Sequence, residues 1–163
     1  MDGKYMSVYL AGYIEKSVID QCIAWRKKIR TTYDNWKGVE RYPIIFLDPC
    51  NGEDWNEIAI NGNNKKIPDH AIVSKDRMCV NNADLIIANM DTFGQTRPPI
   101  GTISEIVWAS EFHKPIITIT DDPLYENHPF IKTFTSWYVK SVDELLDEKI
   151  INQFYKSWTT AIY

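Results

Sequence analysis

The chain has 163 residues, of which 44% are hydrophobic and 25% are charged, and its formal net charge is −4. These values predict a single soluble domain over residues 1–163, and the lack of a long basic cluster argues against binding to a nucleic-acid polymer. The sequence lacks a secretory signal, an apolar run near the roughly 18 residues of a membrane helix, and a CxxC pair among its three cysteines, so we expect a cytoplasmic protein with no disulfide framework and no metal site.

Apolar runs bounded by polar residues alternate along the chain with apolar residues at helical spacing. The runs predict strands and the spacing predicts helices. This alternation predicts an α/β fold, a doubly wound sheet of about five mainly parallel strands with helices on both faces. The predicted strands are residues 7–11, 42–47, 85–88, 115–119 and 135–139, the predicted helices are residues 16–33, 68–81, a segment from residue 101 and 142–158, and residues 52–68 and 121–130 are expected as loops.

Side-chain orientation is predicted for two of these helices. In the first, the basic cluster of Arg26, Lys27, Lys28 and Arg30 is typical of a solvated helix face. In the second, we expect the apolar side chains to face inward, and they are Ile72, Met78 and Cys79.

Several motifs of cofactor enzymes are absent from the sequence. The first strand is not followed by GxGxxG, and neither GxxxxGK[ST] nor HExxH occurs. A dinucleotide oxidoreductase, a P-loop nucleotidase and a zincin therefore lose support, and we expect no cofactor.

Glu105 is the main catalytic candidate, because it is predicted to lie in the first turn of a helix just beyond the carboxyl end of a strand, where α/β sheets place their chemistry. Two interpretations remain open. Thr102 and Glu105 have the spacing of a capping box, as do Ser141 and Glu144, so Glu105 is expected either to cap its helix or to act as a nucleophile. In the second case the helix dipole would hold the carboxylate ionised.

Four segments, in this order, resemble the nucleoside 2-deoxyribosyltransferase family, which includes the related 2′-deoxynucleoside 5′-phosphate N-hydrolases. The resemblance spans nearly the whole chain and implies a flavodoxin-like fold with sites built at subunit contacts. Its segments are Tyr9-Leu10-Ala11-Gly12, the pair Asp76 and Asp84, Gly101-Thr102-Ile103-Ser104-Glu105-Ile106, and Lys114-Pro115.

The resemblance also implies catalytic roles. Glu105 matches the glutamate that forms a deoxyribosyl-enzyme intermediate, Tyr9 the tyrosine that orients it, and Asp76 the aspartate that protonates the leaving base. Each also has an ordinary structural interpretation, as a cap, a strand residue and a solvated helix carboxylate. Asp84 is expected only to cap the start of the third strand.

A further set of residues is predicted to bind the substrate. Tyr13 lies where family members place a base-stacking aromatic, and the terminal Tyr163 resembles a tyrosine whose carboxylate reaches the site. The polar pair Asn127 and His128 corresponds loosely to a residue lent by a neighbouring subunit. The full set is Gly12, Tyr13, Arg97, Gly101, Thr102, Asn127, His128 and Tyr163.

Pro99 departs from the family pattern. Transferases of the family tend to carry an aspartate six residues before the catalytic glutamate, and the hydrolases a serine. Since proline offers neither group, we expect Arg97, Thr102, Ser104 and the helix N-terminus to be able to bind a 5′-phosphate instead.

Three functions follow as alternatives. The first is transfer of deoxyribose from a deoxynucleoside to a free nucleobase, the second is hydrolysis of a deoxynucleoside 5′-monophosphate, and the third is a non-catalytic nucleotide-binding module. A homo-oligomer is also expected from the aromatic residues near the C-terminus, which are Trp137, Tyr138, Phe154, Tyr155, Trp158 and Tyr163.

Overall fold

The structure, a computed structural model, describes residues 5–34, 44–50 and 68–159, with side chains as far as residue 155. Its centre is one five-stranded sheet in which every neighbouring pair is parallel and the strand order is β2-β1-β3-β4-β5. This is the order of the flavodoxin-like fold, so the predicted fold class is confirmed. The strands are β1 (Met6–Gly12), β2 (Ile44–Leu47), β3 (Leu85–Asn89), β4 (Ile116–Ile119) and β5 (Trp137–Val139).

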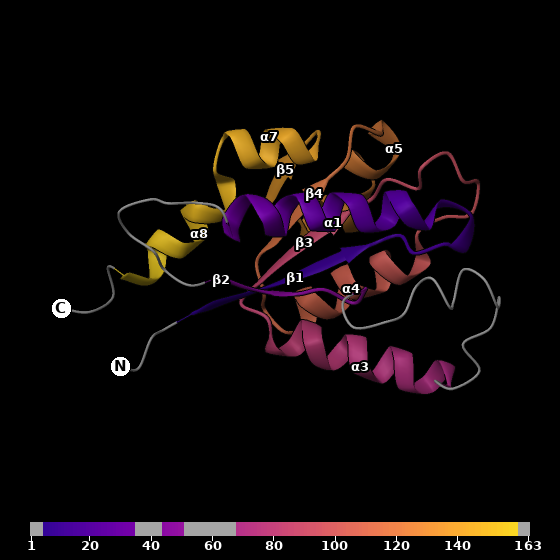
Figure 1. Cartoon of the computed structure of the whole chain (residues 1–163), viewed down its shortest axis with the longest axis horizontal. Helices are drawn as coiled ribbons and strands as arrows, with labels where there is room; N and C mark the ends of the chain where they lie inside the picture. The colour runs from indigo at the N-terminus through magenta and orange to yellow at the C-terminus, as the bar shows by residue number, and fades with distance from the viewer. Residues whose placement is uncertain (1–4, 35–43, 51–67, 160–163) are drawn as a thin grey trace.

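Helices cover both faces of this sheet (Figure 1). In the described residues a 3-10 turn, η1 (Lys16–Val18), leads into the first of them. The helices are α1 (Ile19–Asp34), α3 (Asp69–Asn82), α4 (Ile100–Glu111), α5 (Pro123–Glu126), α6 (Pro129–Phe134), α7 (Val142–Asp147) and α8 (Ile150–Thr159).

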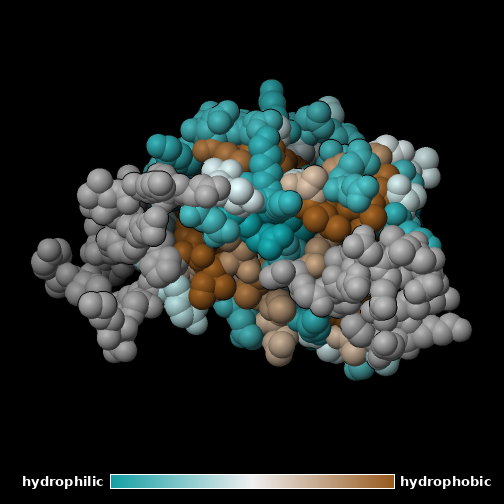
Figure 2. Space-filling model, viewed as in Figure 1, coloured by the Kyte–Doolittle hydropathy of each residue, from teal (hydrophilic) through white to brown (hydrophobic). Residues whose placement is uncertain are grey.

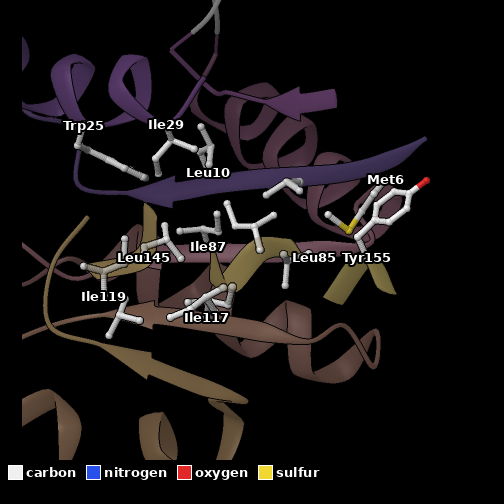
Figure 3. Close-up of a cluster of buried hydrophobic side chains, with 14 residues drawn as sticks. Met6, Leu10, Trp25, Ile29, Leu85, Ile87, Ile117, Ile119, Leu145 and Tyr155 are labelled. Carbon is white, nitrogen blue, oxygen red and sulfur yellow. The ribbon is translucent and has the colours of Figure 1, made fainter. Parts of the chain in front are cut away.

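Two apolar cores lie on opposite faces of the sheet because side chains alternate along each strand. On one face Leu10 and Ile87 pack against Trp25 and Ile29 of α1 and against residues of α7 and α8, as Figure 3 shows. On the other face Tyr9, Ala11, Ile86 and Ala88 pack against α3, α4 and α6. Tyr9 thus points toward the α4 face.

The amino ends of β1 and β3 are joined by Asp84. Its carboxylate accepts hydrogen bonds from the backbone N–H and the hydroxyl of Ser7, at 2.8 and 2.9 Å. This edge is opposite to the one where chemistry is expected, so Asp84 has a structural role there, in line with the sequence-based interpretation.

Three predictions about local structure are wrong. The last predicted helix is two helices, because the chain turns at Lys149, whose φ is 51°. The predicted loop at 121–130 contains α5 and the start of α6, each with a proline in its first turn. The expected inward side chains of α3 are exposed at Ile72 (42%) and Met78 (58%), and only Cys79 is half-buried.

The basic cluster of α1 is only partly a solvated face. Lys27 and Lys28 are exposed, and Lys28 forms a salt bridge with Asp143 of α7. Figure 2 shows extensive hydrophilic surface on the side of the molecule that α1 occupies. Arg26, however, is fully buried, so the prediction is wrong for that residue.

Two expectations concern other parts of the chain. The predicted loop over residues 52–68 lies, except for Pro68, outside the described residues. Within the described ranges, the helices are all too short or too polar to span a bilayer.

Candidate active site

The site lies where the strand order reverses, between β1 and β3. From here β1 leads to α1 on one face of the sheet and β3 leads to α4 on the other. Open α/β sheets bind ligands in the crevice beyond the strands at this point. The loop from β3 to α4 turns at Phe93 (φ 54°) and Gly94 (φ 80°), and the Asp91 carboxylate accepts a hydrogen bond from the Phe93 N–H at 2.7 Å.

The helix that carries Glu105 starts earlier than the capping-box interpretation requires. α4 begins at Ile100 with Pro99 as its N-cap, and no side chain caps it. Thr102 is therefore the third helical residue and Glu105 lies in the second turn. The interpretation of Glu105 as a cap is wrong, whereas the Ser141 hydroxyl does accept the Glu144 N–H, at 3.1 Å.

Glu105 instead points to the sheet. The Tyr9 hydroxyl donates a hydrogen bond of 2.6 Å to Oε1 of Glu105. Both side chains are buried, Tyr9 completely and Glu105 with 7% of its surface exposed. β1 and α4 therefore hold the phenol and the carboxylate in contact, and Oε2 is the carboxylate oxygen that this bond does not use.

Asp76 is the third member of this group. It lies on α3, which packs against α4, and it is half-buried. Its charge raises the pKa values of Glu105, Tyr9 and Cys79, so its carboxylate lies close enough to act on all three. The structure thus brings together the three residues predicted to be catalytic.

Burial controls the electrostatics of Glu105. The pKa of Glu105 is raised from the ordinary value of 4.5 to about 8. Removal from water is the main cause, the Tyr9 hydrogen bond and the Arg26 charge oppose it, and the Asp76 charge adds to it. Burial therefore opposes the ionised state that the helix dipole is expected to favour. The pKa of Tyr9 also lies above its ordinary value, chiefly because of burial, so the phenol is a proton donor to the carboxylate.

Thr102 lies one helical turn before Glu105 on the same buried face of α4. It is 2% exposed, and its hydroxyl has no hydrogen-bond partner among the described residues. A buried hydroxyl without a partner is costly, so it calls for a functional explanation.

The turn after β1 has a tightly packed start. A Cβ atom on Gly12 would lie 2.6 Å from Cζ2 of Trp25 and 3.2 Å from Nη2 of Arg26, so glycine is required there by packing. Tyr13 follows with 5% exposure. The Arg97 guanidinium lies over its ring, 5.4 Å from the centroid, so a base would reach the ring only if Arg97 moved.

Two of the residues expected to bind a phosphate, Arg97 and Ser104, already have protein partners. Arg97 donates to the Glu15 carboxylate at 2.6 Å and to the Tyr13 hydroxyl at 3.3 Å, although its side chain is 60% exposed. The Ser104 hydroxyl donates to the Ile100 carbonyl at 2.9 Å. Gly101 is exposed, and a Cβ atom added to it would meet no described heavy atom within 4 Å, so no contact demands glycine there.

The remaining predicted residues lie farther along the chain. Asn127 and His128 are both exposed between α5 and α6, and the Asn127 amide donates to the Pro123 carbonyl at 2.9 Å. Tyr163 lies outside the described residues. Among the side chains that the structure does describe, no group of three or more His, Cys, Asp and Glu is arranged to hold a metal ion.

Sequence reasoning missed an ion pair beside this site. Arg26 of α1 and Asp48, which follows β2, are 0% and 1% exposed, with 3.6 Å between Nε and Oδ1. The signal was available in the sequence, because Cys22, Trp25, Arg26 and Ile29 are the buried residues of α1 and have the spacing of one helix face. Arg26 occupies a core position of that pattern.

Three solved structures have similar folds. A conserved protein from Enterococcus faecalis V583 is 18% identical with a TM-score of 0.63, over 91% of this chain and 99% of that one. A 2-desoxiribosyltransferase from Leishmania mexicana is 21% identical with a TM-score of 0.50, over 75% and 70%. The CMP N-glycosidase BcmB from Clostridium botulinum is 18% identical with a TM-score of 0.54, over 89% and 98%. The resemblance expected from the sequence is thus confirmed at the level of the fold.

No protein-family model and no curated protein matches the sequence.

Proposed function

We propose that this protein is an enzyme that cleaves the N-glycosidic bond of 2′-deoxynucleosides and transfers the deoxyribosyl group to another nucleobase. The observation that carries this proposal is the buried Glu105 carboxylate, held at 2.6 Å by the Tyr9 hydroxyl at the switch point of the sheet. The shared fold with a 2-desoxiribosyltransferase and a CMP N-glycosidase supports chemistry at the same kind of bond.

In the first step the free oxygen of Glu105 attacks C1′ of the sugar. The bond between C1′ and the base nitrogen breaks as the ester bond forms, and Asp76 donates a proton to the departing base. The Tyr9 hydrogen bond holds the carboxylate in the orientation for attack. A 2′-deoxy sugar suits this step because it lacks the electron-withdrawing 2′-hydroxyl that destabilises the cationic transition state.

In the second step a nitrogen of the incoming base attacks C1′ and releases the Glu105 carboxylate. Asp76 takes up the proton of that base, so the enzyme returns to its starting state. Two displacements at C1′ retain the anomeric configuration, and the kinetics are ping-pong. The burial of Glu105 favours a base over water as acceptor, because an enclosed site limits the access of water.

The test is incubation with a 2′-deoxynucleoside with and without a second free base, followed by chromatography of the products. Transfer predicts a new nucleoside only when the second base is present. The Glu105→Gln variant should form none, whereas Glu111→Gln, an exposed change on the same helix, should behave like the unchanged protein. Absence of cleavage with any deoxynucleoside or deoxynucleotide would remove the proposal.

A second candidate is hydrolysis of a 2′-deoxynucleoside 5′-monophosphate. It is favoured by the exposed Arg97 guanidinium beside the turn after β1 and by the fold shared with a CMP N-glycosidase. Here a 5′-phosphate should raise kcat/KM, and the products should be free base and sugar phosphate whatever acceptor is added. Arg97→Gln should lower kcat/KM for the nucleotide alone, with Lys132→Gln on the exposed side of α6 as the control.

We also propose a homo-oligomer. Among the aromatic residues that prompted this expectation, Tyr155 belongs to the core and Trp137 is 41% exposed. Stronger support comes from α3, where Ile72, Val73 and Met78 are exposed on the Glu105 side of the sheet. Sedimentation should give a species larger than a monomer, and Met78→Lys should shift it toward the monomer.

A further inference from the structure

Arg26 is the most completely buried charged residue among those that the structure describes. Its side chain is 0% exposed, although a guanidinium carries five N–H donors and a permanent charge. Such a group is retained in a protein interior only where it is paired and hydrogen-bonded.

The partners of Arg26 lie at the end of β1. Nε donates to the Leu10 carbonyl at 3.2 Å and Nη2 to the Gly12 carbonyl at 2.9 Å. Nη1 donates to the Cys22 carbonyl at 2.6 Å, which fixes the guanidinium to its own helix. Arg26 therefore joins α1 to two carbonyls of the strand that carries Tyr9.

Asp48 supplies the counter-charge. Its carboxylate lies 3.6 Å from Nε of Arg26 and 3.3 Å from Nε of Arg30, and it accepts the Cys50 N–H at 2.8 Å. Arg30 differs from Arg26, because its side chain is 30% exposed and no hydrogen bond from it to β1 is found in the described residues. One carboxylate thus lies between two cations at the carboxyl ends of β1 and β2.

We propose that Arg26 is a positioning residue for the Tyr9–Glu105 pair, because its hydrogen bonds to the Leu10 and Gly12 carbonyls anchor the end of β1 directly after Tyr9. Its buried positive charge also favours the ionised Glu105 carboxylate. The inference rests on the proposed function only for its effect on turnover. The anchoring and the charge effect on Glu105 can be measured without any substrate.

Several groups other than Arg26 also shift the pKa of Glu105, and each does so in its own direction. The Arg26 charge lowers the pKa of Glu105, whereas Asp76 raises it and the Tyr9 hydrogen bond lowers it. β3 carries no titratable side chain, and α6 offers only an exposed lysine. The groups that interact with Glu105 are Tyr9 from β1, Asp76 and Cys79 from α3, and Arg26 from α1.

The experiment is an NMR titration of the Glu105 carboxyl in ¹³C-glutamate-labelled protein, with the signal assigned by its loss in Glu105→Gln. In Arg26→Met the pKa of Glu105 should rise, because the opposing positive charge is lost and the end of β1 is no longer anchored. Arg26→Lys keeps the charge but cannot bind three carbonyls at once, so the pKa of Glu105 should rise by less than in Arg26→Met. Arg30→Met is the matched control and should leave the pKa unchanged.

Asp48→Asn should shift the pKa of Glu105 in the opposite direction. It leaves Arg26 with less counter-charge, so the pKa of Glu105 should fall. This variant and Arg26→Lys keep the test valid where Arg26→Met fails to fold. An unchanged Glu105 pKa in folded Arg26→Met, or a rise in Asp48→Asn, would overturn the proposal and leave Arg26 as a packing residue only.

Measurements of turnover separate the role proposed for Arg26 from the proposed function of the protein. If the proposed reaction occurs, the rising acid limb of kcat/KM should move with the pKa of Glu105 across these variants, about tenfold in rate per unit at a pH below that limb. If no reaction is found, the titration still tests the role of Arg26. A shifted pKa without any turnover would contradict the proposed function alone.

Discussion

The Tyr9 hydroxyl and the Glu105 carboxylate form a hydrogen bond of 2.6 Å between residues 96 positions apart in the chain. The bond is buried, and it joins β1 to α4. Because it stabilises the ionised carboxylate, it opposes the effect of burial on Glu105. Burial and the Tyr9 hydrogen bond thus shift the pKa of this carboxylate in opposite directions.

Tyr9→Phe tests this bond directly. The ring still fills the core, but Glu105 loses a donor, so its pKa should rise and kcat/KM at pH 7 should fall by about tenfold to a hundredfold, the scale of a hydrogen bond to a charged group. The measurement is the pH profile of kcat/KM.

Tyr33→Phe is the matched control for that change. The Tyr33 hydroxyl donates to Asn152 at 2.9 Å, on the α1 and α8 side of the sheet. Tyr33→Phe should lower the free energy of unfolding about as much as Tyr9→Phe does, and it should leave kcat/KM unchanged. Equal pH profiles for Tyr9→Phe and the unchanged protein would contradict the role of the bond.

The raised pKa of Glu105 also predicts a pH dependence of stability. Between the ordinary value of 4.5 and about 8, the folded protein keeps the Glu105 proton that the unfolded chain releases. The contribution of Glu105 to the free energy of unfolding is therefore fully present below pH 4.5. It is lost as the pH rises toward 8, by about 1.4 kcal/mol per pH unit.

The measurement is the difference in unfolding free energy between Glu105→Gln and the unchanged protein, from urea unfolding at several pH values. Glutamine does not titrate, so the variant should become relatively more stable as the pH rises from 5 to 8. A difference that stays constant over this range would mean that Glu105 is ionised throughout.

Thr102→Val separates a substrate contact from a packing role. Removing a buried hydroxyl that has no partner among the described residues should raise stability by about 1 kcal/mol. If that hydroxyl binds the sugar, kcat/KM should fall by about tenfold. Thermal unfolding and the transfer assay measure the two effects, and a stabilised variant with full activity would exclude the contact.

Thr118→Val provides the comparison for stability. Thr118 is equally buried, but its hydroxyl is hydrogen-bonded to that of Thr135 at 2.7 Å. This change should destabilise the protein, opposite in sign to Thr102→Val.

Gly12→Ala should destabilise the protein by about 1–3 kcal/mol, because the added methyl would lie 2.6 Å from Trp25 Cζ2. Gly101→Ala is the control, since no described atom lies within 4 Å of the added methyl and alanine suits a helix better than glycine. It should leave stability equal or slightly higher. Urea unfolding measures both, and a neutral Gly12→Ala would contradict the packing explanation.

The sheet was predictable from the sequence because β1 and β3 are buried on both faces. Such strands are continuous apolar runs, and the run at Leu85–Asn89 is readily recognised. The candidate catalytic group depended on the resemblance, because the contact between Tyr9 and Glu105 spans 96 positions and leaves no local pattern.

The errors have local physical causes. α4 begins at Ile100, after Pro98 and Pro99, and the Ile103 N–H donates to the Pro99 carbonyl at 2.9 Å. The helix therefore starts before Thr102, the residue that the capping-box pattern suggested as the N-cap. The lysine neighbours of Arg26 favour a surface position in the sequence, whereas its place on the apolar helix face is what buries it. Met78 is exposed although it is apolar, so the inward orientation predicted from its hydrophobicity is wrong.

The most direct test of the central claim is to quench a reaction with a 2′-deoxynucleoside in acid, digest the protein, and search by mass spectrometry for a deoxyribosyl group on Glu105. We predict the adduct on the peptide that contains Glu105, in the unchanged protein and in Glu111→Gln, and its absence in Glu105→Gln. Turnover that persists in Glu105→Gln, or a sugar adduct on another residue, would contradict a nucleophilic role for this carboxylate.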